Sequence, residues 1–137
     1  MSRLGARGPA TLLVALALTG CAGFFSGRFP APEDFEQHAR EADYFELHWS
    51  YRRPGPAVLE AQGIIVNRFG PAMRTVTLEL ASFDRAGKPL HRRRVTPPGW
   101  LDRFDTLPFT IRLPLNGEEA SFMLRVYRYD YLVVPDA

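Results

Sequence analysis

From residue 44 to residue 131 the chain is built largely from segments in which apolar and polar side chains alternate with a period of two. Neighbouring side chains of a β-strand point to opposite faces, so this alternation predicts strands with one buried face. Segments with this pattern, or short apolar runs, recur with Pro, Gly or Asn-Gly turns between them; they cover residues 44–52, 58–67, 75–83, 90–95, 109–115 and 120–131. Short strands in this number, without a helix among them, predict an all-β domain that folds as an antiparallel two-sheet sandwich of six to seven strands.

Length and charge fit one such domain. The chain has 137 residues, 46% hydrophobic and 23% charged, which suits a single globular domain and excludes a disordered chain. Two of the 17 Lys and Arg residues, Arg3 and Arg7, lie in the first twenty positions; the other 15 equal the 15 Asp and Glu. Without that segment the net charge is zero, so no global field draws the chain to nucleic acid, and no nucleic-acid partner is expected.

The first twenty residues have the organisation of an export signal. Arg3 and Arg7 precede the apolar segment 11–18. Eight helical residues extend about 12 Å, much less than the ~30 Å hydrocarbon core of a bilayer, so this segment is too short to span a membrane. Residues 1–20 are therefore predicted to be a signal peptide.

The residues that end this signal, Leu18-Thr19-Gly20-Cys21, resemble the lipobox of bacterial lipoproteins. The resemblance implies cleavage before Cys21, a diacylglycerol attached to its sulfur and, in many bacteria, a third acyl chain on its new amino group. Two or more acyl chains hold a protein firmly at a membrane. A generic signal peptide or a buried cysteine is the alternative interpretation. Cys21 is the only cysteine, which excludes an intrachain disulfide and a Cys-cluster metal site.

The residue after Cys21 bears on the destination. It is Ala22, whereas an Asp at this position commonly keeps such lipoproteins at the inner membrane. The resemblance therefore implies an anchor in the outer membrane that faces the periplasm, and a Gram-positive cell surface is the alternative. Residues 21–43 are predicted to be the lipidated N-terminus and a tether. Within them residues 33–42 are expected to form a short helix, because Pro32 suits the first turn of a helix. The sandwich domain is then residues 44–137.

Several motifs of the domain follow one another in a familiar order. Gly63 and Asn67 lie four apart in one predicted strand, the turn Phe83-Asp84-Arg85-Ala86-Gly87 ends the next, and a run from Pro108 to Pro114 begins a later one. Residues 55–131 in this respect resemble the FxLYD-type immunoglobulin-like domains of bacterial surface and periplasmic lipoproteins. The namesake run is replaced here by Leu80-Ala81-Ser82-Phe83-Asp84. The resemblance implies an immunoglobulin-like sandwich and no known chemistry.

Motifs for catalysis or metal binding were not found. The three histidines, His38, His48 and His91, lack the spacing of metal ligands, and the chain has no nucleophile elbow, P-loop or dinucleotide-binding fingerprint. His48 falls on the polar face of its predicted strand and is expected at the surface. We therefore predict a non-enzymatic protein without catalytic residues, cofactor or metal.

Positive charge is concentrated in one predicted strand. Its residues His91-Arg92-Arg93-Arg94 follow closely on Arg85 and Lys88. Arg92, Arg93 and Arg94 are candidates for contact with an anion, either lipid phosphate, peptidoglycan carboxylates or an acidic patch on a partner. The alternative is an edge strand whose charge prevents pairing between sheets. Because no aromatic residues interleave with the arginines, the cluster does not indicate nucleic-acid binding.

Three tyrosines form a second candidate surface in the last strand. Strict alternation places Tyr127, Tyr129 and Tyr131 on one face, in a stripe about 13 Å long. The opposite, inward row is Ala120, Phe122, Leu124 and Val126. Tyrosine offers contact area with little loss of entropy, so the stripe suits a protein partner. The alternative is that the stripe packs under the N-terminal segment, against Trp49 or Phe35.

These features together predict a membrane-anchored envelope lipoprotein that acts through protein contacts in a periplasmic or outer-membrane assembly. A carrier of small ligands or lipids is the alternative function. A carrier needs an apolar cavity of several hundred Å³, whereas the bulky inward rows predict a filled core.

Overall fold

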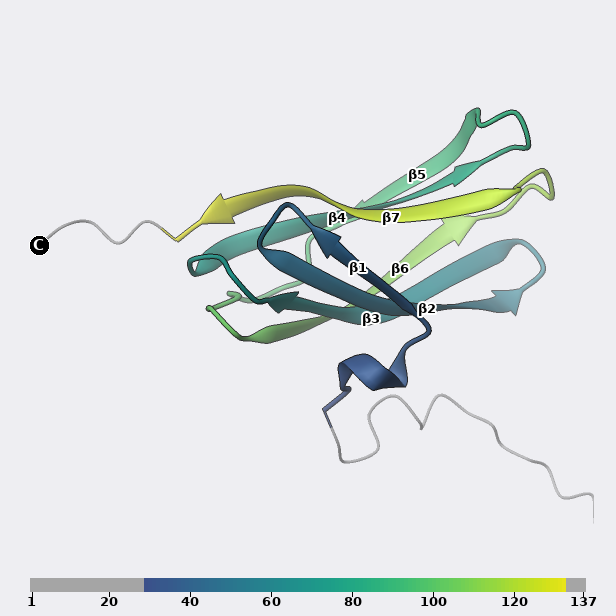
Figure 1. Cartoon of the computed structure of the whole chain (residues 1–137). Helices are drawn as coiled ribbons and strands as arrows, with labels where there is room; N and C mark the ends of the chain where they lie inside the picture. Colours follow the sequence, from purple (N-terminus) through teal and green to yellow (C-terminus); the bar gives the residue numbers. More distant parts are fainter. Residues whose placement is uncertain (1–28, 133–137) are drawn as a thin grey trace, which may run out of the picture.

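The computed structural model describes residues 29–132, so the predicted signal peptide, Cys21 and Ala22 lie outside the described residues. Seven strands form two antiparallel sheets that pack face to face (Figure 1). The elements in chain order are the 3₁₀ turn η2 (Pro32–Asp34) and the strands β1 (Gln37–Glu41), β2 (Phe45–Gly55), β3 (Val58–Asn67), β4 (Met73–Phe83), β5 (Pro89–Val95), β6 (Thr106–Pro114) and β7 (Ser121–Tyr131). The prediction of an all-β two-sheet sandwich is confirmed.

The chain passes between the sheets three times. One sheet has the order β1-β2-β3-β6 and the other the order β5-β4-β7, so the crossings follow β3, β5 and β6. Immunoglobulin-like sandwiches label their strands A to G, and strands B and E pair in one sheet and strands C and F in the other. If β2 is taken as strand A, the β3–β6 pair corresponds to B–E and the β4–β7 pair to C–F. The crossings after β3 and β5 bring their two loops to the same end of the molecule.

The core lies between the sheets and is made by the inward rows that alternation predicts. Leu47 of β2, Leu78 of β4 and Leu124 of β7 are all buried there. Ala120, which the pattern assigned to the inward row, is exposed because it precedes β7. Hydrophobic burial of this kind is the main term that favours folding, so these rows account for the sandwich.

Gly63 makes a close approach in the core possible. In register it lies between Trp49 of β2 and Phe109 of β6, and both aromatic side chains lie close to the space that a side chain at Gly63 would occupy. A Cβ atom at Gly63 would lie 2.7 Å from atoms of both side chains and would overlap the backbone carbonyl of His48. Only glycine fits at this position of β3.

The predicted helix over residues 33–42 is wrong. Pro32 does start a turn, but it is a single 3₁₀ turn, and the chain then extends into β1, which pairs with β2. A ten-residue helix is marginal in water by itself, whereas strand pairing satisfies the same backbone groups. Phe35, between η2 and β1, is buried against Ile64 and Val66 on the outer face of β3. The sandwich therefore begins before residue 44.

Candidate functional site

A bulge in β7 decides where the tyrosines point. Leu78 of β4 lies opposite Val126. The preceding residue of β4, Thr77, lies opposite Arg128, which leaves Tyr127 as an extra residue in β7. An extra residue reverses the inside–outside alternation beyond it. The prediction that the three tyrosines share one face is therefore wrong.

After this bulge, the side chain of Tyr129 points toward the core. Its ring centroid is 5.4 Å from that of Phe45 and 5.8 Å from that of Tyr44, both in edge-to-face geometry. Of the two interpretations of the tyrosines, contact with a partner or packing within the domain, packing is therefore correct for Tyr129. Its partners come from the start of β2 and from the turn before it, and they are not the predicted residues Trp49 and Phe35.

Tyr131 lies at the end of β7, where it is 43% exposed. Its hydroxyl donates a hydrogen bond to the hydroxyl of Tyr44 at 3.3 Å, and this bond raises the pKa of Tyr131. Its ring also meets that of Tyr129 at 5.7 Å between centroids. Tyr131 therefore belongs to an aromatic group with Tyr44 and Tyr129, and it does not continue the surface around Tyr127.

Tyr127 joins arginines on the outer face of the three-stranded sheet. The guanidinium carbon of Arg94 lies 3.6 Å from the centroid of the Tyr127 ring, and that of Arg125 lies 5.8 Å from it. A cation over an aromatic face is attracted by the ring quadrupole. Sequence reasoning placed Tyr127 and Arg94 in two separate candidate groups; the structure brings them into contact.

Glu79 of β4 holds these arginines in place. Nε of Arg94 donates to Oε2 of Glu79 at 2.9 Å, and Nη2 of Arg125 donates to Oε1 at 2.8 Å. Glu79 is only 2% exposed. Burial raises the pKa of its carboxyl group, but the hydrogen bonds from the two arginines lower it by more, so the pKa lies below its usual value. Two guanidinium groups on one carboxylate leave a net positive charge.

Two further side chains complete this surface. Arg92 of β5 and Met123 of β7 both pair in register with Ala81 of β4, two residues from Glu79, and therefore face the same side. Both are exposed. We call the whole set the Glu79 face; its members are Glu79, Arg92, Arg94, Met123, Arg125 and Tyr127.

The three candidate arginines divide between two sides of β5. Arg93 pairs in register with Leu80, whose side chain is in the core, so Arg93 points away from the Glu79 face. β5 has one neighbour in its sheet, β4. β5 is therefore an edge strand, as the alternative interpretation of the arginines requires, and contact with an anion stays a prediction.

The other sheet carries a similar ionic group on its outer face. Nε of Arg112 on β6 donates to Oε2 of Glu60 at 2.7 Å, and Nε of Arg52 on β2 donates to Oε1 at 2.5 Å. Burial raises the pKa of Glu60, but the hydrogen bonds from both arginines lower it by more, so the pKa lies below its usual value. An Arg–Glu–Arg row across three strands is thus a repeated structural element. The Glu79 face differs from it in its exposed aromatic ring and thioether.

Sequence reasoning missed both glutamates. Glu60 and Glu79 occupy polar positions of strands, where an acidic side chain is expected to be solvated. Only the strand register shows that an arginine lies on either side of each of them. The nearest signal in the sequence is the number of arginines at polar positions of neighbouring predicted strands.

His48 is buried, which contradicts its predicted surface position. Its Nδ1 lies 2.6 Å from Nδ1 of His38, its cross-strand partner on β1, and its Nε2 lies 3.3 Å from Oε2 of Glu46. Arg68 also donates to Glu46, and this hydrogen bond is the main reason that the pKa of Glu46 is lowered. The prediction failed because β1 pairs beside this part of β2 and places His38 against His48, whereas the sequence indicated a helix there. Within residues 29–132 no group of three or more His, Cys, Asp or Glu side chains is arranged to hold a metal ion.

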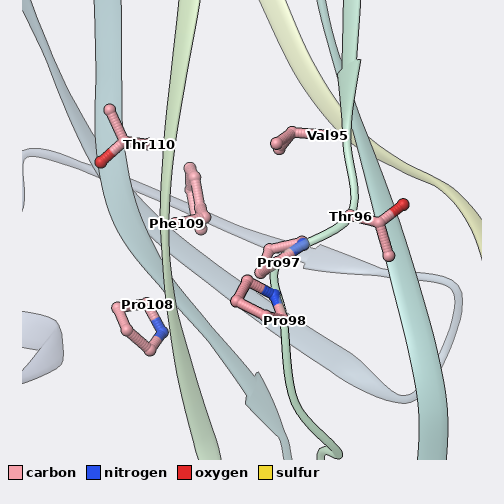
Figure 2. Close-up of a pocket in the computed structure, with 7 residues that line it drawn as sticks. All are labelled: Val95, Thr96, Pro97, Pro98, Pro108, Phe109 and Thr110. Carbon is pink, nitrogen blue, oxygen red and sulfur yellow. The ribbon is translucent and has the colours of Figure 1, made fainter.

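An apolar hollow of about 230 Å³ lies where β5 and the chain after it approach β6. Its lining residues are Val95, Thr96, Pro97, Pro98, Pro108, Phe109 and Thr110. Figure 2 shows that it lies between the edges of the two sheets, with Pro97 and Pro98 on one side and Phe109 on the other. Ligand pockets usually enclose about 300–1,000 Å³, so this hollow gives little support to a carrier function.

The described chain is therefore an all-β sandwich with an Arg–Glu–Arg row on the outer face of each sheet. Comparison with protein-family models, with curated proteins and with solved structures gave no match. Over the described part of the chain, no helix is long and apolar enough to cross a membrane.

Proposed function

We propose that the protein is a non-enzymatic, lipid-anchored component of the bacterial cell envelope, at the outer membrane and facing the periplasm. In this proposal the acylated Cys21 holds the sandwich at the membrane, and the Glu79 face binds another envelope protein. The anchor is supported by the sequence from Leu18 to Cys21, which follows a short apolar segment. The contact surface is supported by the stacking of Arg94 on the exposed ring of Tyr127.

The chemistry of the Glu79 face suits an acidic partner. Tyrosine and arginine, with tryptophan, are enriched among the residues that dominate the binding energy of protein interfaces. Arg94 and Arg125 are already fixed by Glu79, so they lose little side-chain entropy when a partner binds. Arg92 adds a further positive charge beside them, and Met123 adds a flexible apolar contact. A surface of this kind matches carboxylates that surround an apolar residue.

The similar row on the other sheet supplies a matched control for the contact. Arg94→Ala removes one of the two arginines from Glu79, and Arg112→Ala removes one of the two from Glu60. In crosslinking of intact envelopes, Arg94→Ala and Tyr127→Ala should each abolish the main crosslinked product, whereas Arg112→Ala should retain it. If Arg112→Ala has the same effect as Arg94→Ala, the loss reflects the stability of the sandwich, and the proposed contact surface is wrong.

The anchor has a separate test. Mass spectrometry of the mature protein should find acyl chains on Cys21, and Cys21→Ser should release the protein from membranes or leave an unprocessed precursor. A Cys21→Ser protein that still fractionates with membranes at the mature size would contradict the anchor.

A further inference from the structure

Three large aromatic side chains are exposed at one end of the sandwich. Phe69 lies in the loop between β3 and β4, and Trp100 and Phe104 lie in the loop between β5 and β6. Their exposed fractions are 48%, 65% and 68%. Both loops lie where β3 ends and β6 begins (Figure 1). We call this surface the aromatic end.

The two loops of the aromatic end are joined by one buried side chain. The amide nitrogen of Asn67 donates to the carbonyl oxygen of Pro71 at 2.8 Å and to that of Leu101 at 3.2 Å. Its amide oxygen accepts a hydrogen bond from the backbone N–H of Gly70 at 2.9 Å. Met73 and Leu101 exchange backbone hydrogen bonds beside it. These bonds fix the loops, so the aromatic rings are presented by an ordered backbone.

Phe104 is held in a conformation that its own packing does not explain. Its φ angle is +68°, a region that bulky residues rarely occupy, and its backbone N–H donates to the carbonyl oxygen of Asn67 at 2.6 Å. The side chain gains little from the core, because about two thirds of the residue is exposed. Strain of this kind is typical of functional surfaces.

Arginines lie against two of the rings. The guanidinium carbon of Arg40 is 4.8 Å from the centroid of Phe69, and that of Arg103 is 5.2 Å from the centroid of Phe104. Asp102 and Asp105, which flank Arg103 and Phe104 in the same loop, offset the charge of the two arginines. The aromatic end therefore combines apolar rings with nearly balanced charge, which favours contact through apolar surface over attraction by net charge.

The number of residues between Cys21 and the sandwich limits how far the aromatic end can lie from the bilayer. Phe29 is the first described residue, and Cys21 lies eight residues earlier. Eight residues extend at most about 29 Å, whereas an eleven-residue strand such as β7 is about 36 Å long. If Cys21 carries acyl chains, the sandwich stays within about its own length of the bilayer. Phe35 packs on Ile64 and Val66, in the last four residues of β3, so the chain enters the sandwich along the half of β3 that leads to the aromatic end.

We propose that Phe69, Trp100 and Phe104 insert into the interfacial region of the lipid bilayer in which the protein is anchored. This inference rests on the lipid anchor of the proposed function and adds an orientation to it. Tryptophan concentrates at membrane interfaces. Arg40 and Arg103 can place their stems along the rings and their guanidinium groups at lipid phosphates. In this orientation the Glu79 face, on the outer side of a sheet, remains available to a partner.

The chain contains its own probe for this contact. It has two tryptophans, of which Trp49 is buried in the core and Trp100 is exposed at the aromatic end. The acylated full-length protein would be placed in phosphatidylethanolamine–phosphatidylglycerol vesicles, with or without lipids brominated close to the headgroup. Bromine quenches tryptophan at short range, so the emission of Trp100 should fall at least twofold in brominated vesicles. Trp100→Phe leaves Trp49 as the only fluorophore and should lose this quenching.

The difference between the wild-type protein and Trp100→Phe isolates the exposed tryptophan without a change in the core. Because charge at the aromatic end is nearly balanced, the quenching should persist in 0.5 M NaCl. Acylated, vesicle-bound protein without quenching of Trp100 would overturn the insertion and leave the anchor intact. Quenching that disappears in salt would indicate electrostatic docking and would also overturn it. A mature protein without acyl chains on Cys21 would overturn the anchor and, with it, this orientation.

Discussion

Truncation of Tyr129 should destabilise the sandwich far more than truncation of Tyr127. In a regular strand these two residues would lie on the same face. The bulge at Tyr127 is the reason. Tyr129 packs against Phe45 and Tyr44 at the edge of the core, whereas Tyr127 lies on the outer face against Arg94.

The size of the difference follows from these contacts. Full burial of a large aromatic residue makes its truncation to alanine worth about 3–5 kcal/mol. Tyr129 is only partly buried, so we expect Tyr129→Ala to lower the free energy of unfolding by about 2–4 kcal/mol. Tyr127→Ala removes a cation–π contact at an exposed site, which contributes about 0.5–1 kcal/mol. For a domain of this size 1 kcal/mol corresponds to roughly 4 °C, so the melting temperatures should differ by about 8 °C.

Urea unfolding followed by far-ultraviolet circular dichroism measures both variants against the wild-type protein. Equal slopes with denaturant would confirm that only stability has changed. Tyr129→Phe is the control, because it keeps the ring and removes only the hydroxyl, and it should unfold close to the wild type. If Tyr127→Ala is as destabilising as Tyr129→Ala, or more so, the side chains of β7 do not change faces at Tyr127, and the packing assigned to Tyr129 is wrong.

Three other perturbations test the packing and the ionic groups. Gly63→Ala should lower the free energy of unfolding by about 2–3 kcal/mol, because the new Cβ overlaps a backbone carbonyl; a neutral effect in thermal melts would contradict the close approach at this strand. His48→Ala should be destabilising by about 1–3 kcal/mol, since it removes a buried hydrogen-bonding group, and a loss under about 0.5 kcal/mol would instead fit a surface position. Folding lowers the pKa of Glu60 and Glu79, so their contribution to stability is present above the usual pKa of 4.5 and should be lost as the pH falls through the lower values of the folded state. Urea unfolding at a series of acidic pH values should show this decline, and the double variant Glu60→Gln, Glu79→Gln should show a flatter profile; an unchanged profile would indicate that other carboxyl groups are responsible.

Features that depend on local sequence were predicted correctly. Alternation identified the buried face of β2 and β4, because a strand sends successive side chains to opposite sides whatever its neighbours are. The turn that ends at Gly87 was also identified from its residues. It joins β4 to β5, and Gly87 has a positive φ of 79°, which glycine adopts readily. The sequence also marked Gly63 and Asn67, although only as parts of a resemblance. The structure gives each a physical role, one in close packing and the other in holding two loops.

The candidate site could be predicted only in part. The sequence drew attention to Tyr127 and Arg94, because unusual clusters of tyrosine and arginine are visible without a structure. It did not predict that they would meet, because their contact depends on which strands are neighbours and on the bulge in β7.

The all-β class, most of the strands and their buried faces follow from local sequence, since they depend on the chemical character of residues two positions apart. Other features depend on contacts between distant parts of the chain. Residues 37–41 became a strand because β2 offered an edge to pair with, and His48 was buried by that pairing. Glu79 met Arg94 and Arg125 because strand register aligned residues 15 and 46 positions apart. Such long-range pairings depend on the packing of the whole chain, and a short window of sequence does not contain that information.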